Sequence, residues 1–121
     1  MLKPTQRIKQ RYVLFRVIPN KYTEEDVHRM IYSSLRSLYG DVGVYPLGYK
    51  LISFHSDTGY GIVRFSRKHL YRGIAALVMI TRYQDEKVRV RSISTSGTLK
   101  KLRERLNRYL DASESNFIPN S

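Results

Sequence analysis

Residues 58–65 (TGYGIVRF) are rich in β-branched and aromatic side chains and predict a β-strand. On a strand, successive side chains point to opposite faces, so Tyr60, Ile62 and Arg64 share one face and Gly61, Val63 and Phe65 the other. The second face is the natural core face. Residues 56–59 (Ser-Asp-Thr-Gly) are typical of a tight turn. They predict a hairpin between this strand and a preceding strand over residues 49–55.

The first forty residues predict one further strand and one helix. Residues 11–18 alternate, with Val13, Phe15 and Val17 expected inward and Tyr12, Leu14 and Arg16 outward. Apolar residues then recur at steps of three and four over residues 24–39, which is typical of an amphipathic helix. Thr23 is expected to cap this helix and Gly40 to end it.

The second half of the chain predicts a helix over residues 67–80, starting after Ser66, and a fourth strand over residues 87–93 with Val88 and Val90 inward. The order strand, helix, strand, strand, helix, strand predicts an α+β fold, a ferredoxin-like or RNA-recognition-like sandwich. In that fold the four strands form an antiparallel sheet whose first and third strands are central.

Residues 98–110 predict a third helix, with a stripe of leucines at Leu99, Leu102, Leu106 and Leu110. This stripe either covers the open face of the sheet or docks a partner protein. The predicted organisation is therefore a basic arm over residues 1–10, one domain over residues 11–110, and a polar, disordered tail over residues 111–121.

Charge narrows the class of partner. The chain has 22 Lys and Arg against 10 Asp and Glu, and residues 59–105 hold twelve of these cations with only three acids. This excess favours nucleic acid, where Lys and Arg displace the counterions condensed on phosphates. An anionic membrane would satisfy the charge too, but the longest apolar run has seven residues, whereas a span needs about 20. We expect no membrane partner.

Side chains that could bind a metal or take part in catalysis are scattered along the sequence. The chain has no cysteine, and His28, His55 and His69 lack ligand spacing, so neither disulfides nor a metal site is expected. The acids fall in predicted turns and at one helix start, and they form no catalytic constellation. With no secretory leader in the sequence, we expect a cytoplasmic protein.

The strand from Tyr60 also fits part of the first ribonucleoprotein motif of RNA-recognition domains, at Gly59, Tyr60, Gly61, Val63 and Phe65 but not at Thr58 or Ile62. In the predicted sheet, Tyr12, Arg16, Tyr60 and Arg64 would be neighbours, with Arg89 and Arg91 on an edge strand. Such a face would stack bases on its aromatic rings and bind phosphates through arginine. The alternative is an ordinary hairpin strand whose turn happens to precede an aromatic residue.

A second candidate site precedes the third helix. Ser96, Gly97 and Thr98 offer hydroxyls and backbone amides at a helix N-terminus, followed by Lys100 and Lys101, which suits a phosphate. It is not a Walker loop, because the leading glycine and the Gly-Lys-Ser/Thr ending are absent. Plain capping by Ser96 or Thr98 is the alternative.

Four segments, in order and spacing, resemble the archaeal ribonuclease P protein component 2 family: residues 7–12 (RIKQRY), 38–40 (LYG), 61–64 (GIVR) and 96–100 (SGTLK). The resemblance covers residues 7–106. It implies a subunit of the endonuclease that removes the 5′ leader of precursor tRNA, in which the RNA and its bound Mg²⁺ perform the hydrolysis and the protein stabilises the RNA. It also implies pairing with ribonuclease P protein component 3, in a heterotetramer, and no cofactor on the protein itself. The RNA contacts it implies are Arg7, Lys9, Arg11, Arg64 and Lys100, beside Gly97 and Thr98.

Two other functions remain open from the sequence. A free-standing module for single-stranded RNA would depend on Tyr12 and Tyr60 for stacking. A ferredoxin-like protein-interaction domain would show no steep salt dependence with RNA.

Overall fold

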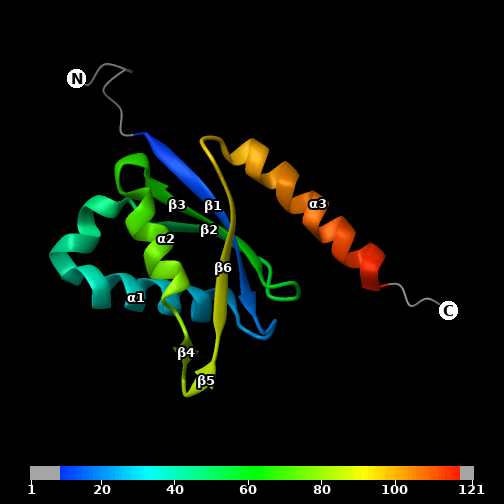
Figure 1. Ribbon diagram of the computed structural model, residues 1–121, viewed down its shortest axis with the longest axis horizontal. Helices are drawn as coiled ribbons and strands as arrows, with labels where there is room; N and C mark the ends of the chain where they lie inside the picture. Colours follow the sequence, from blue (N-terminus) through cyan, green and yellow to red (C-terminus); the bar gives the residue numbers. More distant parts are fainter. Residues whose placement is uncertain (1–8, 118–121) are drawn as a thin grey trace.

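The computed structural model describes the backbone of residues 9–117 and the side chains of residues 9–112. The elements are β1 (Gln10–Ile18), α1 (Glu24–Val44), the 3₁₀ turn η2 (Tyr45–Leu47), β2 (Lys50–Phe54), β3 (Tyr60–Ser66), the 3₁₀ turn η3 (Arg67–His69), α2 (Leu70–Val78), β4 (Arg82–Tyr83), β5 (Glu86–Lys87), β6 (Arg89–Ser96) and α3 (Leu99–Phe117). Four strands form an antiparallel sheet in the order β2-β3-β1-β6. The predicted α+β sandwich with an added C-terminal helix is confirmed (Figure 1).

The main core lies between the sheet and the pair α1 and α2. It takes the side chains that alternation predicts, among them Val13, Phe15 and Val17 of β1 and Val63 and Phe65 of β3, all fully or almost fully buried. Helix α1 contributes the apolar stripe expected of it. Its N-terminus is closed by a capping box, in which Thr23 Oγ1 accepts from the Asp26 amide and the Asp26 carboxylate accepts from the Thr23 amide.

The opposite face of the sheet packs against α3, which Figure 1 shows on the side away from α1 and α2. Leu102 and Leu106 bury themselves against Leu14, Tyr60 and Ile62 and form a second, smaller core. Leu14 was expected to face outward, yet it is fully buried, because α3 lies over it. Arg105 connects α3 to β6, because its Nη1 donates to Ser94 Oγ at 2.7 Å and to the Thr95 carbonyl at 2.9 Å. Of the two alternatives for the leucine stripe, covering the sheet is the one the structure adopts.

Several boundaries differ from the predicted ones. Gly40 breaks α1 with a φ of 73°, but the helix resumes and reaches Val44. The predicted fourth strand begins only at Arg89, because residues 82–87 form a separate two-stranded ribbon whose turn residues Gln84 and Asp85 have positive φ. Helix α3 continues to Phe117, so residues 111–117 of the predicted tail are helical, and residues 118–121 lie outside the described part of the chain.

Candidate nucleic-acid interface

Basic side chains gather where β1 and β2 begin and β3 and β6 end. The register places Tyr12 opposite both Arg64 and Ser96, and Arg64 opposite Lys50. The Arg67 amide donates to the Lys9 carbonyl at 2.8 Å, which brings η3 to the same edge. We call this group the basic end; its members are Lys9, Arg11, Lys50, Arg64, Arg67, Lys68, Lys100 and Lys101.

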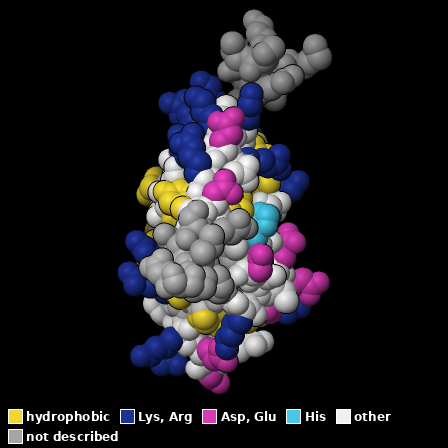
Figure 2. Space-filling model, turned by 90° about the vertical axis from the view of Figure 1, so that its right-hand side faces the viewer, with side chains coloured by type: hydrophobic (Ala, Val, Ile, Leu, Met, Phe, Trp, Pro, Cys, Tyr) yellow, Lys and Arg dark blue, Asp and Glu magenta, His cyan; other side chains and the backbone are white. Residues whose placement is uncertain are grey.

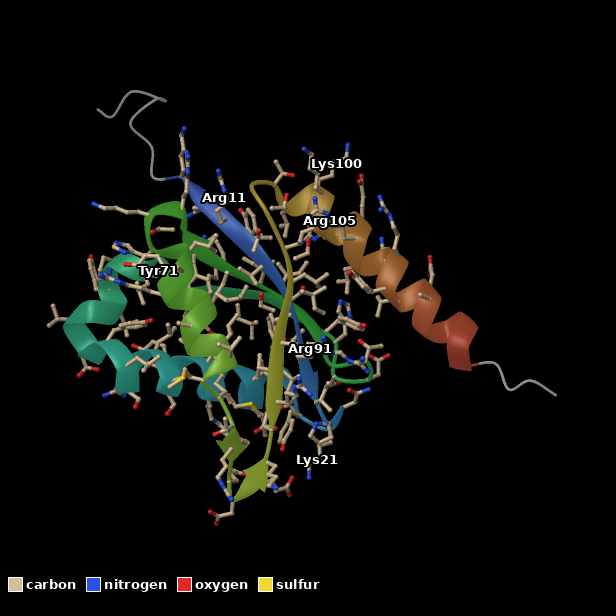
Figure 3. The ribbon with its side chains drawn as sticks, viewed as in Figure 1. Arg11, Lys21, Tyr71, Arg91, Lys100 and Arg105 are labelled. Carbon is tan, nitrogen blue, oxygen red and sulfur yellow. The ribbon has the colours of Figure 1, made fainter. Side chains whose placement is uncertain are left out.

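The basic end is separated from most of the carboxylates. Among the described side chains, none of the acids belongs to these strand ends. Glu24, Glu25 and Asp26 lie at the start of α1, Asp57 lies in the turn between β2 and β3, and Asp85 and Glu86 belong to the ribbon of β4 and β5. Glu104 of α3 is the acid nearest in sequence to Lys100 and Lys101. Figure 2 shows a group of Lys and Arg side chains near the top of the molecule, with acidic side chains beside them and other basic side chains lower down, and Figure 3 shows Arg11 and Lys100 at the upper end. The charge therefore forms a local positive field of the kind that attracts a polyanion.

The start of α3 is closely tied to β1. A Cβ atom on Gly97 would lie 3.1 Å from Arg11 Nη1, so the guanidinium rests against the backbone of this turn. Thr98 Oγ1 accepts from the Lys101 amide at 3.4 Å, and Ser96 Oγ accepts from the Thr98 amide at 3.2 Å. Capping by Thr98 is thus what the structure shows for this segment, and phosphate binding by Ser96, Gly97 and Thr98 stays a prediction.

Tyr60 requires a correction, because the ring is only 6% exposed. The Tyr109 ring of α3 stacks on it with centroids 5.9 Å apart, and the Arg16 guanidinium carbon lies 5.1 Å from its centre. The prediction that Tyr60 is open for base stacking is therefore wrong. Tyr12, also proposed for stacking, is half-buried and packs against the same cluster.

The match to the ribonucleoprotein motif has a packing explanation instead. A Cβ on Gly61 would lie 2.6 Å from Phe15 Cζ and 2.9 Å from the Ser53 carbonyl oxygen, so only glycine fits there. Val63 and Phe65 are fully buried in the main core. These positions serve the sheet, whatever the outer face binds.

The other predicted contacts divide into two groups. Lys9, Arg11, Arg64, Lys100 and Lys101 meet at the basic end, where Arg64 Nε donates to the Gly48 carbonyl at 3.3 Å. Arg16, Arg89 and Arg91 lie further along β1 and β6; Arg91 is opposite Arg16 and Arg89 is opposite Ile18. Figure 3 shows Arg91 well away from Arg11 and Lys100. Arg7 lies outside the described residues.

Sequence reasoning missed three members of the basic end: Lys50, Arg67 and Lys68. A signal was present for the last two, because cations at the start of a helix oppose its dipole and suggest an anionic partner. Lys50 had no such signal, since only the cross-strand register brings it opposite Arg64.

Across residues 9–112 there is no group of three or more His, Cys, Asp or Glu placed to hold a metal ion. Within the described helices, none is long and apolar enough to cross a membrane. The pKa of Asp26 is lowered by the Thr23 amide, and that of Glu86 by the Lys21 ammonium. Both acids hold loops in place, far from the basic end.

Comparison with known proteins identifies the family of this chain. The model of the Rpp14/Pop5 family matches residues 11–107. Ribonuclease P protein component 2 of Pyrococcus furiosus is 30% identical over 105 residues, which cover 86% of this chain and 88% of that protein. The protein of the same name from Methanocorpusculum labreanum is 35% identical over 107 residues, covering 88% of this chain and 71% of that one.

Among solved structures, one chain of the cryo-EM structure of yeast ribonuclease MRP aligns with a TM-score of 0.62, covering 92% of this chain and 95% of that chain. At 10% identity this likeness shows the fold alone. The family match and the relatives confirm the resemblance found in the sequence motifs: the chain belongs to the Rpp14/Pop5 family.

Proposed function

We propose that this chain is a protein subunit of ribonuclease P and that it binds and stabilises the RNA of that enzyme through the basic end. The subunit role follows from the family and from relatives named as ribonuclease P protein component 2. The observation that carries RNA binding is the convergence of eight cations, from Lys9 and from β1, β2, β3, η3 and α3. In the described chain the strand ends add no acid to this group, and α3 adds Glu104. Such a surface complements the phosphates of a structured RNA better than it complements an acidic protein, whose charges are irregularly placed.

In this proposal the enzyme removes the 5′ leader of precursor tRNA, and the RNA performs the hydrolysis with the Mg²⁺ ions that it holds. The protein binds no cofactor. The carboxylates of Glu86 and Asp26 already serve as partners of Lys21, Tyr22 and Tyr83, and the basic end is suited to phosphate and repels cations. The proposal includes a cytoplasmic location for the protein.

We further propose that ribonuclease P protein component 3 docks on the helical side of the molecule, opposite α3, and that the two assemble as a heterotetramer. This side carries exposed apolar side chains, among them Tyr45 at 91%, Tyr71 at 66% and Met79 at 60% exposure. Figure 3 shows Tyr71 on the outer side of α2. A cleft of about 470 Å³ between the middle of α1 and the segment that follows α2 is lined in part by Leu38, Met79 and Tyr83. A patch of this kind is typical of a protein interface.

The experiment that tests the RNA proposal compares two variants in binding to the ribonuclease P RNA of the same organism, over a series of salt concentrations. Replacing Lys100 and Lys101 by alanine should reduce the slope of log K against log salt by about 2, because each phosphate contact contributes about 0.9. The matched control is Arg36→Ala, since Arg36 Nε is paired with Asp41 Oδ1 at 2.6 Å on α1. A flat salt dependence of the unmodified chain would remove RNA binding and favour a protein-interaction domain.

The rival module for single-stranded RNA is less favoured by the geometry. Base stacking needs an open aromatic face, and α3 covers Tyr60 while Tyr12 packs beneath the same helix.

A further inference from the structure

The ribbon of β4 and β5 carries two cations directly across from each other. In its register Arg82 pairs with Lys87, and Tyr83 pairs with Glu86. Like charges at directly opposite positions destabilise an antiparallel pair. Solvated surface charge would explain two isolated residues, but three further features of this ribbon favour a bound anion.

The first feature is that the other face of the ribbon is anchored. Tyr83 Oη donates to Asp26 Oδ1 at 3.0 Å, and its ring meets that of Tyr22 edge to face with centroids 5.7 Å apart. Glu86 forms an ion pair with Lys21 and accepts from Tyr22 Oη at 3.3 Å. The one acid within the paired residues is therefore already engaged on the anchored face, and it is not opposite Arg82 or Lys87.

The second feature is a third cation. A cleft of about 540 Å³ has Arg82, Lys87 and Arg89 on its walls and Ile18 and Pro19 beside them. Arg89 is held there by the sheet, because it pairs with Ile18 at the end of β1. The Val88 amide donates to the Thr81 carbonyl at 3.0 Å, which closes the base of the ribbon. Three cations are thus presented by a restrained backbone, which lowers the entropy lost on binding.

The third feature is position. Figure 1 shows the ribbon at the opposite end of the molecule from the start of β1, and Figure 3 shows Lys21 at that lower end. From Arg11 to Ile18 the strand advances seven residues, or roughly 23 Å at about 3.3 Å per residue. A phosphate in this cleft therefore belongs to a different stretch of backbone from the phosphates at the basic end.

We propose that the cleft of Arg82, Lys87 and Arg89 is a second phosphate site, which binds the backbone of an RNA segment separate from the one at the basic end. This inference rests on the proposed function, because it assumes an RNA partner. The chain then bridges two RNA segments and fixes their spacing, a direct way for a small protein to stabilise a folded RNA.

The test uses the full chain and the ribonuclease P RNA of its organism, with hydroxyl-radical footprinting and salt titration. The test variant replaces Arg82 and Lys87 by alanine. It should lose protection of one RNA segment, keep protection of the other, and lower the salt slope by about 2. The basic-end variant, with Lys100 and Lys101 replaced by alanine, should lose the other segment. The control Arg36→Ala removes a cation that belongs to neither site, because Arg36 Nε is paired with Asp41 Oδ1 on α1, so it should leave both footprints intact.

Folding of the test variant is checked by its melting temperature, which should not fall, because the substitutions relieve a like-charge pair. If the unmodified chain protects no RNA, the proposed function fails, and the second site fails with it. If the unmodified chain and the basic-end variant behave as described but the ribbon variant keeps both footprints, only the second site is overturned. Saturation of the ribbon amides by inorganic phosphate in NMR, with RNA protection unchanged in the ribbon variant, would identify a small-anion site and also overturn the RNA assignment.

Discussion

The guanidinium carbon of Arg16 lies 5.1 Å from the centre of the Tyr60 ring, and the two residues are directly opposite each other on β1 and β3. Tyr109 stacks on the same ring from α3. Tyr60 therefore packs α3 against the sheet, and its ring makes contacts inside the protein.

Replacing Tyr60 by alanine should reduce the free energy of unfolding by about 3–5 kcal/mol, the range for removing a large buried aromatic side chain. Urea unfolding measures this loss. The affinity of the folded variant for ribonuclease P RNA should stay within a few-fold of the unmodified chain. A variant as stable as the original but deficient in RNA binding would restore the stacking function that the structure argues against.

Among the side chains of α3 that the structure describes, Leu102 is the most buried, at 0% exposure. Leu102→Ala should cost about 2–5 kcal/mol of unfolding free energy, since it leaves a cavity against Leu14 and Ile62. The matched control is Val42→Ala, because Val42 is 88% exposed and should change stability by no more than about 0.5 kcal/mol. Equal stability of the two variants would mean that α3 does not rest on the sheet in solution.

Gly61 leaves room for the Phe15 ring, which a Cβ would meet at 2.6 Å. Gly61→Ala should destabilise the protein by about 1–3 kcal/mol through overpacking, as measured by thermal unfolding. If the melting temperature is unchanged while RNA affinity drops, this glycine serves the RNA and the packing explanation of the motif is wrong.

The stability of the protein should fall in acid partly through Asp26. Its pKa is lowered in the folded state, chiefly because the Thr23 amide donates to the carboxylate and then because Tyr83 Oη does. A lowered folded-state pKa means that the stabilisation is complete above the unfolded pKa of about 3.9 and is lost as pH falls through the folded value. Melting temperatures of the unmodified chain and of Asp26→Asn should therefore differ most near pH 6, and the difference should shrink steadily as the pH falls below about 3.9. A constant difference over this range would contradict the linkage.

Much of the fold follows from local patterns in the sequence. The alternation of residues 11–18 and 60–65 identified the central strands and their inward faces, and Thr23 was correctly expected to cap α1. These features depend on neighbours within a few residues, so a single sequence carries them. The four motif segments also identified the family, which the family match confirms.

The site was harder to predict because its parts meet only through the tertiary fold. No local sequence pattern indicates that α3 folds back over β1 and β3. Leu14 and Tyr60 were therefore expected to face solvent, whereas both are buried under α3. Lys50 joins the basic end only through its register with Arg64, and the opposition of Arg82 and Lys87 depends on a ribbon that the sequence presented as a plain turn. Charge composition indicated the class of partner, and the strand order determined where the charges meet.

The central claim is that this chain works on the RNA of ribonuclease P. The most direct measurement is to tag the chain in its own cells, purify it at moderate salt, and sequence the RNA that accompanies it, beside a basic-end variant with Lys100 and Lys101 replaced by alanine. The account predicts strong enrichment of ribonuclease P RNA with the unmodified chain and reduced recovery with the variant. A mixed or ribosomal RNA population, recovered equally with both proteins, would contradict it.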